Sequence, residues 1–132
     1  METRLRILDA EGNHLQGHLP LNLATNGNLK DINLRSNVFS GDVPKIYGER
    51  LESSWRSLYL ENNYVTCSLP EEFQRISKQI RGSLSNNCMQ CPKNVTIFQG
   101  VQKPKSQCNA GVEIILYDQS SCPCLVLIML EM

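Results

Sequence analysis

The most reactive side chains of this 132-residue sequence are six cysteines, all in its second half: Cys67, Cys88, Cys91, Cys108, Cys122 and Cys124. In an oxidising compartment cysteines at this density form disulfides, and in a reducing one they stay free or bind metal. The Cys88-x-x-Cys91 pair, with the last two cysteines, also permits a four-thiolate zinc site, although zinc sites usually show two C-x-x-C pairs. We therefore expect disulfides and no metal, with unpaired thiols as the other alternative. A redox motif is not expected, because no thioredoxin-like βαβ pattern surrounds the pair.

Catalytic chemistry has few candidates in this chain. His14 and His18 are the only histidines, and no serine or cysteine stands at a spacing that suggests a triad with either. No Gly-rich phosphate loop or kinase motif occurs. The formal net charge is zero, with 13 acidic and 13 basic residues and no block of like charges. The sequence therefore argues against an enzyme, a cofactor, and nucleic acid or an anionic membrane surface as partner.

The elements that must position these side chains follow from a repeated skeleton of apolar, Asn, Gly and Pro residues. One copy reads Leu29-Lys-Asp-Ile-Asn-Leu-Arg-Ser-Asn-Val-Phe-Ser-Gly-Asp-Val-Pro44. The copies align on Asn13, Asn37, Asn63 and Asn87, at intervals of 24, 26 and 24 residues, and the fourth copy is degenerate. The repeats occupy about residues 5–28, 29–54, 55–78 and 79–92, so that 1–92 form the repeat region and 93–132 a C-terminal cap and tail.

Each skeleton position has a physical reason. The period-2 pair Ile32 and Leu34 points to one face of a short strand, and stacked copies bury that face as a continuous column in a parallel sheet. The Asn after each strand can satisfy buried backbone groups that would otherwise each cost about 1–3 kcal/mol. Gly17 and Gly41 allow tight backbone geometry, and the following prolines fix φ where the return segment begins.

This skeleton resembles the leucine-rich repeat, and the Gly-x-(Leu/Val)-Pro tail of the first two copies is similar to the plant-type subclass of about 24 residues per repeat. The resemblance covers about residues 5–92. It departs from the family pattern at Ala10, at Cys67 in place of Gly, and in a two-residue insertion between Pro44 and Trp55. It implies an α/β repeat fold: a right-handed solenoid of about four repeats, with a parallel sheet on the concave face and a C-terminal cysteine-bearing cap.

The return segments are expected to be short. Residues 20–28 read as a single helical or 3₁₀ turn, and the best helix candidate is 71–78, whose acidic first turn suits the helix dipole. The insertion of the second repeat falls within 45–54. Trp55 takes the first leucine position of its repeat, so packing is a better interpretation than ligand binding.

Two cysteines at equivalent positions of adjacent repeats suggest a disulfide pairing. Cys67 and Cys91 both lie four residues after the Asn of their repeat, about one strand spacing apart, which favours a Cys67–Cys91 bridge. Cys88–Cys108 would then close the cap. Cys88–Cys91 or Cys91–Cys108, with Cys67 free, remains the alternative.

The C-terminal part, 93–132, has no repeat. It carries a glycosylation sequon at Asn94-Val-Thr96, which fits a secreted glycoprotein. Two β-prone runs follow at 112–117 and 124–130. The second is too short to span a bilayer, which needs about 20 apolar residues, and it could be the start of a membrane anchor, a cap strand or frameshifted sequence.

The concave face is the expected binding surface, because its side chains point away from the core. Glu11, Arg35 and Glu61 are expected to form a ladder of alternating charge, which reads either as cross-strand pairing or as part of a binding patch. The candidate ligand-binding residues are Asp31, Asn33, Arg35, Ser57, Tyr59, Glu61 and Arg81.

Function follows from the resemblance, which implies an extracellular or cell-surface recognition module of a receptor-like or inhibitor-like protein that binds a protein or peptide, in signalling or defence. The first residues carry no signal peptide and no cysteine-bearing N-terminal cap. We therefore expect a piece of a longer ectodomain, attached to a membrane only through a missing or truncated anchor. The alternative is a truncated fragment that binds nothing specific. The pattern leaves the oligomeric state open.

Overall fold

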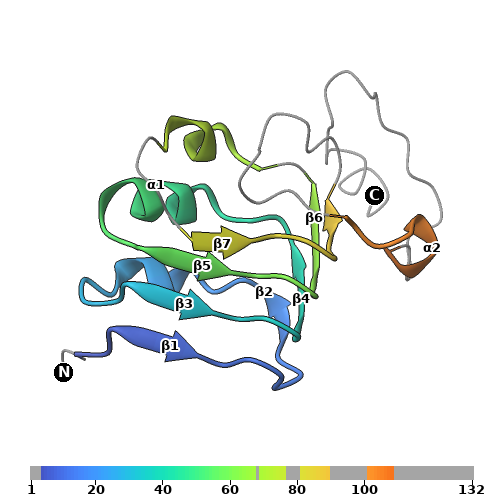
Figure 1. The fold of residues 1–132 in the computed structure, drawn as a ribbon, viewed down its shortest axis with the longest axis horizontal. Coiled ribbons are helices and arrows are strands. Elements are labelled where there is room, and N and C mark those ends of the chain that lie inside the picture. Colours follow the sequence, from blue (N-terminus) through green and yellow to red (C-terminus); the bar gives the residue numbers. More distant parts are fainter. Residues whose placement is uncertain (1–3, 68, 77–80, 90–100, 109–132) are drawn as a thin grey trace, which may run out of the picture.

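The computed structural model describes residues 4–67, 69–76, 81–89 and 101–108, which wind into stacked coils (Figure 1). Each of the four coils contributes one short strand to each of two parallel sheets. The strands are β1 (Ile7–Asp9), β2 (Gln16–His18), β3 (Asp31–Asn33), β4 (Val38–Gly41), β5 (Ser57–Tyr59), β6 (Tyr64–Cys67), β7 (Arg81–Ser83) and β8 (Cys88–Met89). The helices are η1 (Leu21–Thr25), α1 (Lys45–Ser53), η2 (Glu71–Arg75) and α2 (Lys105–Cys108), of which η1 and η2 are 3₁₀ turns.

The first sheet has the strand order β1-β3-β5-β7, and its register is the one the repeats predict. Ile32 lies opposite Leu8 on one side and Leu58 on the other. Both Ile32 and Leu58 are almost fully buried, because each strand turns its apolar face into the stack. The predicted repeat solenoid, with equivalent residues stacked in columns, is therefore confirmed.

A second four-stranded parallel sheet, β2-β4-β6-β8, forms from the residues that follow the repeat asparagines Asn13, Asn37, Asn63 and Asn87. The sequence predicted only the sheet on the concave face, whereas residues such as those of β2 form a second one. The strands of this second sheet are too short for their pattern to be recognised in the sequence. In β4, for example, Phe39 is buried while its neighbours Val38 and Ser40 are exposed, which is a period-2 alternation over only three residues.

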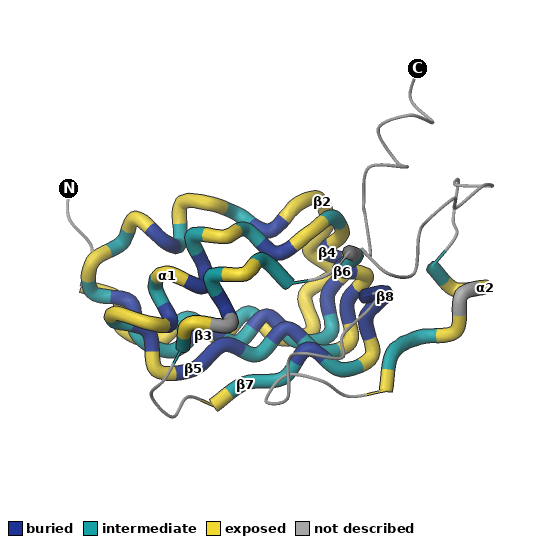
Figure 2. The backbone as a smooth tube through the Cα atoms, turned by 90° about the horizontal axis from the view of Figure 1, so that it is seen from above, coloured by how far each residue is buried: buried dark blue, intermediate teal, exposed yellow. Residues whose placement is uncertain are grey.

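The core lies between the two sheets and the helical return segments, as the dark tube sections of Figure 2 show. Trp55 is fully buried and packs edge-on against Tyr47, with ring centroids 5.0 Å apart. The predicted packing role of Trp55 is therefore confirmed. The Tyr47 hydroxyl donates a hydrogen bond to the Pro20 carbonyl at 2.6 Å. Burial raises the pKa of Tyr47 above its ordinary value, because the ionised phenolate would lose its hydration.

The helical return segments differ from the sequence-based expectation. The only α-helix of more than one turn among the described residues is α1, which takes up the insertion of the second repeat. The candidate helix at 71–78 is instead the 3₁₀ turn η2, and 77–80 lie outside the described residues. The turn η2 packs closely on α1, since a Cβ on Gly48 of α1 would lie 2.8 Å from the Phe73 ring of η2. No helix among the described residues is long and apolar enough to cross a membrane.

Two glycines that belong to strands of the second sheet give a matched test. Gly17 and Gly41 have φ of 96° and 85°, as the predicted tight geometry requires, but only Gly41 lies so close to the His18 ring that an added Cβ would overlap it. Gly17→Ala should cost about 1–2 kcal/mol of unfolding free energy through backbone strain. Gly41→Ala should cost about 1 kcal/mol more, because the ring must also move. Urea unfolding followed by Trp55 fluorescence measures both, and equal losses would contradict the His18 contact.

Candidate functional site

The concave face of the first sheet, which is turned away from the core, carries the predicted binding residues in columns across the strands. Asp31 of β3 lies opposite Ser57 of β5, which lies opposite Arg81 of β7. Asn33 and Tyr59 form the next column. The short strands fix these positions because their alternate residues are held in the core, so the side chains between them must point outward.

Arg35 and Tyr59 form a stacked contact on this face. The Arg35 guanidinium carbon lies 4.1 Å above the centroid of the Tyr59 ring, at cation–π distance. Arg35 Nε lies 3.1 Å from Glu61 Oε1, but its buried N–H has no aligned hydrogen-bond partner, so this contact is electrostatic. The side chains of Arg35 and Glu61 remain 32% and 34% exposed. The guanidinium is therefore held in place and still reaches solvent.

The carboxylates at the β1 and β3 end of this face bind polar neighbours. Asp31 accepts hydrogen bonds from Ser57 Oγ at 2.8 Å and from Arg56 Nη2 at 2.9 Å. Asn33 Nδ2 donates to both Asp9 and Glu11, at 3.2 and 3.1 Å. The predicted Glu11–Arg35–Glu61 ladder is therefore wrong in one half, because the Asn33 amide takes the Glu11 carboxylate and Arg35 pairs with Glu61 alone.

A shallow hollow of about 220 Å³ lies between these side chains. Five of the seven predicted residues line it, whereas Glu61 adjoins it through Arg35 and Arg81 stands exposed on the neighbouring strand. Sequence reasoning did not select Ile7 and Asp9 for the site, although their columns in the repeat alignment place them beside Asp31 and Asn33. The lining residues are Ile7, Leu8, Asp9, Asp31, Ile32, Asn33, Arg35, Ser57 and Tyr59.

The scaffold beneath this face is held by a ladder of asparagines. Asn37 Oδ1 accepts the backbone N–H groups of Asn13 and Leu15, both at 2.9 Å, and its Nδ2 donates to carbonyls of its own and the preceding coil. Asn63 and Asn87 repeat this pattern and are fully buried. These residues therefore serve the backbone, as their spacing predicted, and do not face a ligand.

Comparison of the sequence with known families identifies the same repeats that the asparagines and the stacked strands show. The profile of the Leucine Rich Repeat family matches residues 4–26 and 54–76, the first and third repeats. The chain is a leucine-rich repeat protein.

Comparison with solved structures finds a similar chain in the crystal structure of a plant ice-binding protein, at a TM-score of 0.47 and 23% sequence identity. The alignment covers 68% of this chain and 37% of that one. No curated protein matches the sequence.

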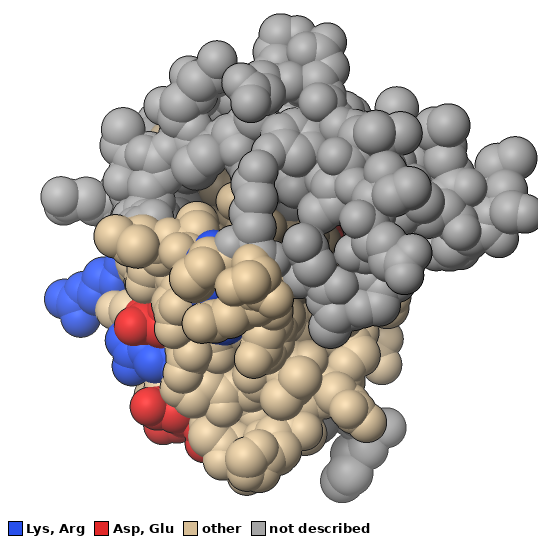
Figure 3. Space-filling view, turned by 90° about the vertical axis from the view of Figure 1, so that its right-hand side faces the viewer, with Lys and Arg blue, Asp and Glu red and all other residues tan. Residues whose placement is uncertain are grey.

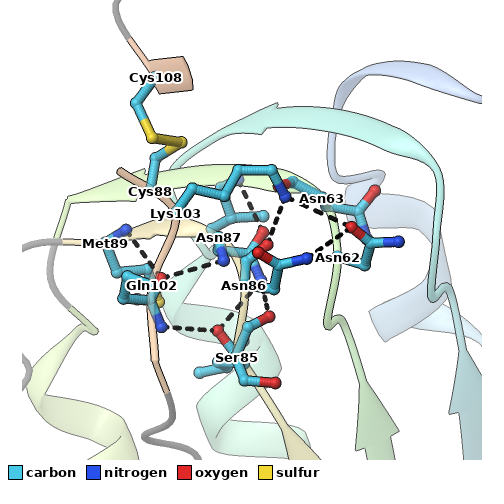
Figure 4. Close-up of a disulfide and its surroundings, with 12 residues drawn as sticks. Asn62, Asn63, Ser85, Asn86, Asn87, Cys88, Met89, Gln102, Lys103 and Cys108 are labelled. Carbon is cyan, nitrogen blue, oxygen red and sulfur yellow. Dashed lines mark hydrogen bonds between the residues drawn. A yellow bond between two sulfur atoms is a disulfide. The ribbon is translucent and has the colours of Figure 1, made fainter. Parts of the chain in front are cut away.

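The ladder of asparagines ends at Gln102, a residue that the repeat period does not identify. Gln102 Oε1 accepts the backbone N–H groups of Asn87 and Met89, both at 3.1 Å, and Gln102 Nε2 donates to the Leu84 carbonyl (Figure 4). Asn37 makes the same bonds to the coil before it. Gln102 therefore replaces the asparagine of a fifth repeat, and the only signal in the sequence was its amide side chain.

Lys103 completes this closure. Its ammonium group donates to the carbonyls of Asn63 at 2.8 Å and Asn86 at 2.5 Å, and it lies 4.6 Å from the Tyr64 ring centroid. Partial desolvation lowers the pKa of Lys103. The last coil of the repeat stack is thus covered by segment 101–108.

A disulfide between Cys88 and Cys108 anchors that segment to β8, with the two Cα atoms 5.7 Å apart (Figure 4). This is the pairing expected to close the cap. It removes Cys88 from the alternative zinc set and contradicts the Cys88–Cys91 and Cys91–Cys108 alternatives. The Cys67–Cys91 bridge and the Asn94 sequon stay predictions, because Cys91 and Asn94 lie outside the described residues, as does the side chain of Cys67. Within those residues no three His, Cys, Asp or Glu side chains are grouped to hold a metal.

The second sheet presents a different surface. Viewed from the side of β2, β4 and β6, it is almost free of charged side chains (Figure 3). Its exposed residues include Val38, Ser40 and Tyr64. The charged contacts of Arg35 and Asp31 lie on the first sheet and not on this surface.

Proposed function

We propose that the chain recognises a protein or peptide through the concave face of the sheet β1-β3-β5-β7. The stacked pair of Arg35 and Tyr59 beside the hollow carries this proposal. Tyr and Arg are the side chains most often found at binding hot spots, because they combine apolar area with directed hydrogen bonds. Held by Tyr59 and Glu61, the guanidinium loses little further conformational freedom when a ligand binds, which reduces the entropic cost of association.

The ligand site is best placed across β1, β3 and β5. Asp31, with Arg56 and Ser57 bonded to it, supplies acceptors at one side of the hollow, and Arg35 supplies donors at the other. Ile7, which is 61% exposed, offers apolar area at the rim. An extended peptide that carries both a polar side chain and an apolar side chain matches this arrangement. Arg81 would contact a longer ligand on the β7 side.

The proposed setting is extracellular, as part of a receptor-like or inhibitor-like protein. Two observations support it. The Cys88–Cys108 disulfide is typical of chains that fold in an oxidising compartment. The Gly-x-(Leu/Val)-Pro tails of the first two repeats resemble those of plant-type repeats, which serve in recognition and signalling.

Binding can be tested without a known ligand. Peptides are selected from a phage-displayed random library on the immobilised chain, and the best binder is measured by calorimetry. Tyr59→Ala and Arg35→Ala should each raise its Kd at least about tenfold, or 1.4 kcal/mol. Tyr64→Ala is the matched control, since it removes an exposed tyrosine from the second sheet, and it should change the Kd less than about twofold.

The opposite result rejects the site. Selected peptides that depend on Tyr64 and not on Tyr59 would move recognition to the second sheet. Failure to select any peptide above background would favour the alternative, a repeat fragment without a specific ligand.

A further inference from the structure

Arg35 is held on the concave face by contacts from both neighbouring coils. Its carbonyl accepts the Gly12 N–H at 3.0 Å, and the next residue, Ser36, donates to the Glu61 carbonyl at 3.1 Å. The side chain is fixed as well, since its guanidinium carbon lies 4.1 Å above the centroid of the Tyr59 ring and its Nε lies 3.1 Å from Glu61 Oε1. Interior contacts of the stack therefore place both the backbone and the side chain of Arg35.

The two terminal nitrogens of this guanidinium are open. Glu61 Oε1 approaches the group at Nε, and Nη1 and Nη2 form no hydrogen bond with the described residues. The other carboxylate that was expected beside Arg35, that of Glu11, is bound by the Asn33 amide at 3.1 Å. Because Arg35 lines the hollow, the remaining N–H donors of its planar fork are available to a group that enters there.

We infer that Nη1 and Nη2 of Arg35 bind a carboxylate of the recognised peptide, either of an acidic side chain or of the C-terminus. This rests on the proposed function and names the chemical group that the hollow selects. A carboxylate matches the guanidinium fork with two parallel N–H···O bonds, and such charge-assisted bonds are about twice as strong as neutral ones. Stacking on Tyr59 restricts rotation of the fork, so the carboxylate meets donors that are already oriented.

The charges on the interior coils agree with a singly charged anionic group. The Asp31 carboxylate is already bonded to Arg56, whereas Arg81, two strands from Arg35 in the same sheet, forms no ion pair with the described residues. Glu61 limits the negative charge that the site accepts, because its carboxylate lies 3.1 Å from Arg35 and repels a second anion. A carboxylate therefore fits better than a phosphate, whose charge is about −1.5 to −2 at neutral pH.

Peptides selected on the immobilised chain serve as the probes. They come from a phage library displayed with free C-termini, so that both sources of a carboxylate are present. In the best binder each Asp or Glu is replaced by its amide, and the C-terminal carboxylate is amidated, one change at a time. One change should raise the Kd for the wild-type chain at least about tenfold, but less than about twofold for Arg35→Gln. A loss at an internal residue identifies a side chain as the source, and a loss on amidation identifies the C-terminus.

Two matched variants separate the fork from its charge. Arg35→Lys keeps the positive charge but loses the paired donors, so the Kd of the unmodified peptide should still rise at least about fivefold. Arg81→Gln removes a charge from the same face, and in this variant loss of the carboxylate should still cost about tenfold, as in the wild type. Where the critical group is an Asp or Glu side chain, phosphoserine in its place should bind no more tightly.

The outcomes distinguish this inference from the proposed function. Binders that depend on Tyr59 but keep their Kd without any carboxylate would overturn the inference and leave the function in place. So would a carboxylate whose removal costs as much in Arg35→Gln as in the wild type, or a phosphoserine peptide that binds more tightly. Binders that do not depend on Tyr59, or a selection that yields none, would reject the proposed function and the inference together.

Discussion

Replacing Asn63 by alanine is expected to lower the free energy of unfolding by about 3–5 kcal/mol. The Asn63 side chain is fully buried and donates to the carbonyls of Leu34 and Leu60, at 2.9 and 3.0 Å, and it accepts the Phe39 N–H at 3.1 Å. Alanine removes the partner of all these backbone groups but cannot admit water to them, so each keeps its desolvation penalty. Because small domains are stable by about 5–15 kcal/mol, the variant should be close to unfolding at 37 °C.

The matched control is Asn13→Ala, at the same position of the first repeat. The Asn13 amide is exposed and donates only to Ala10 and Glu11 carbonyls that water can reach. Its loss should cost less than about 1 kcal/mol. Urea unfolding followed by circular dichroism measures both variants. A similar loss at the two positions would mean that the ladder does not stabilise the fold through buried backbone groups.

The ladder illustrates what the sequence could predict. The interval of 24 to 26 residues between asparagines aligns equivalent residues of successive coils, so a single periodicity sets the register of the first sheet and the identity of its columns. Asp31, Asn33, Ser57 and Tyr59 could be placed on one face for this reason alone. Their contacts could not, since Arg35 had the carboxylates of Glu11 and Glu61 within reach and side-chain geometry decided between them.

Features outside the period were harder to predict. Helix α1 occupies an insertion that no other repeat shares, so no alignment between copies supported it. The second sheet consists of strands of two to four residues, in which alternation is too short to recognise. Gln102 lies 15 residues after Asn87, whereas the repeat period would put the next asparagine about 24 residues after it. The bridge to Cys108 and the folding of the chain over the last coil bring it into place, and both are tertiary effects.

Replacing both Cys88 and Cys108 by alanine should lower the free energy of unfolding by about 3 kcal/mol. The bridge joins residues 20 apart in the sequence, and closing a loop of this length removes about this much conformational entropy from the unfolded chain. Substitution confines the change to this bridge, whereas a reductant would act on the other cysteines as well. Equilibrium urea unfolding gives the value.

Gln102→Ala separates the bridge from the hydrogen bonds it supports. This variant keeps the disulfide but leaves the N–H groups of Asn87 and Met89 without their acceptor, which should cost about 1–3 kcal/mol. Hydrogen exchange of these two amides should accelerate in both variants if the bridge holds Gln102 in place. Fast exchange in Gln102→Ala together with unchanged exchange in the double cysteine variant would show that the cap docks without the disulfide, and the bridge would then act on the unfolded chain alone.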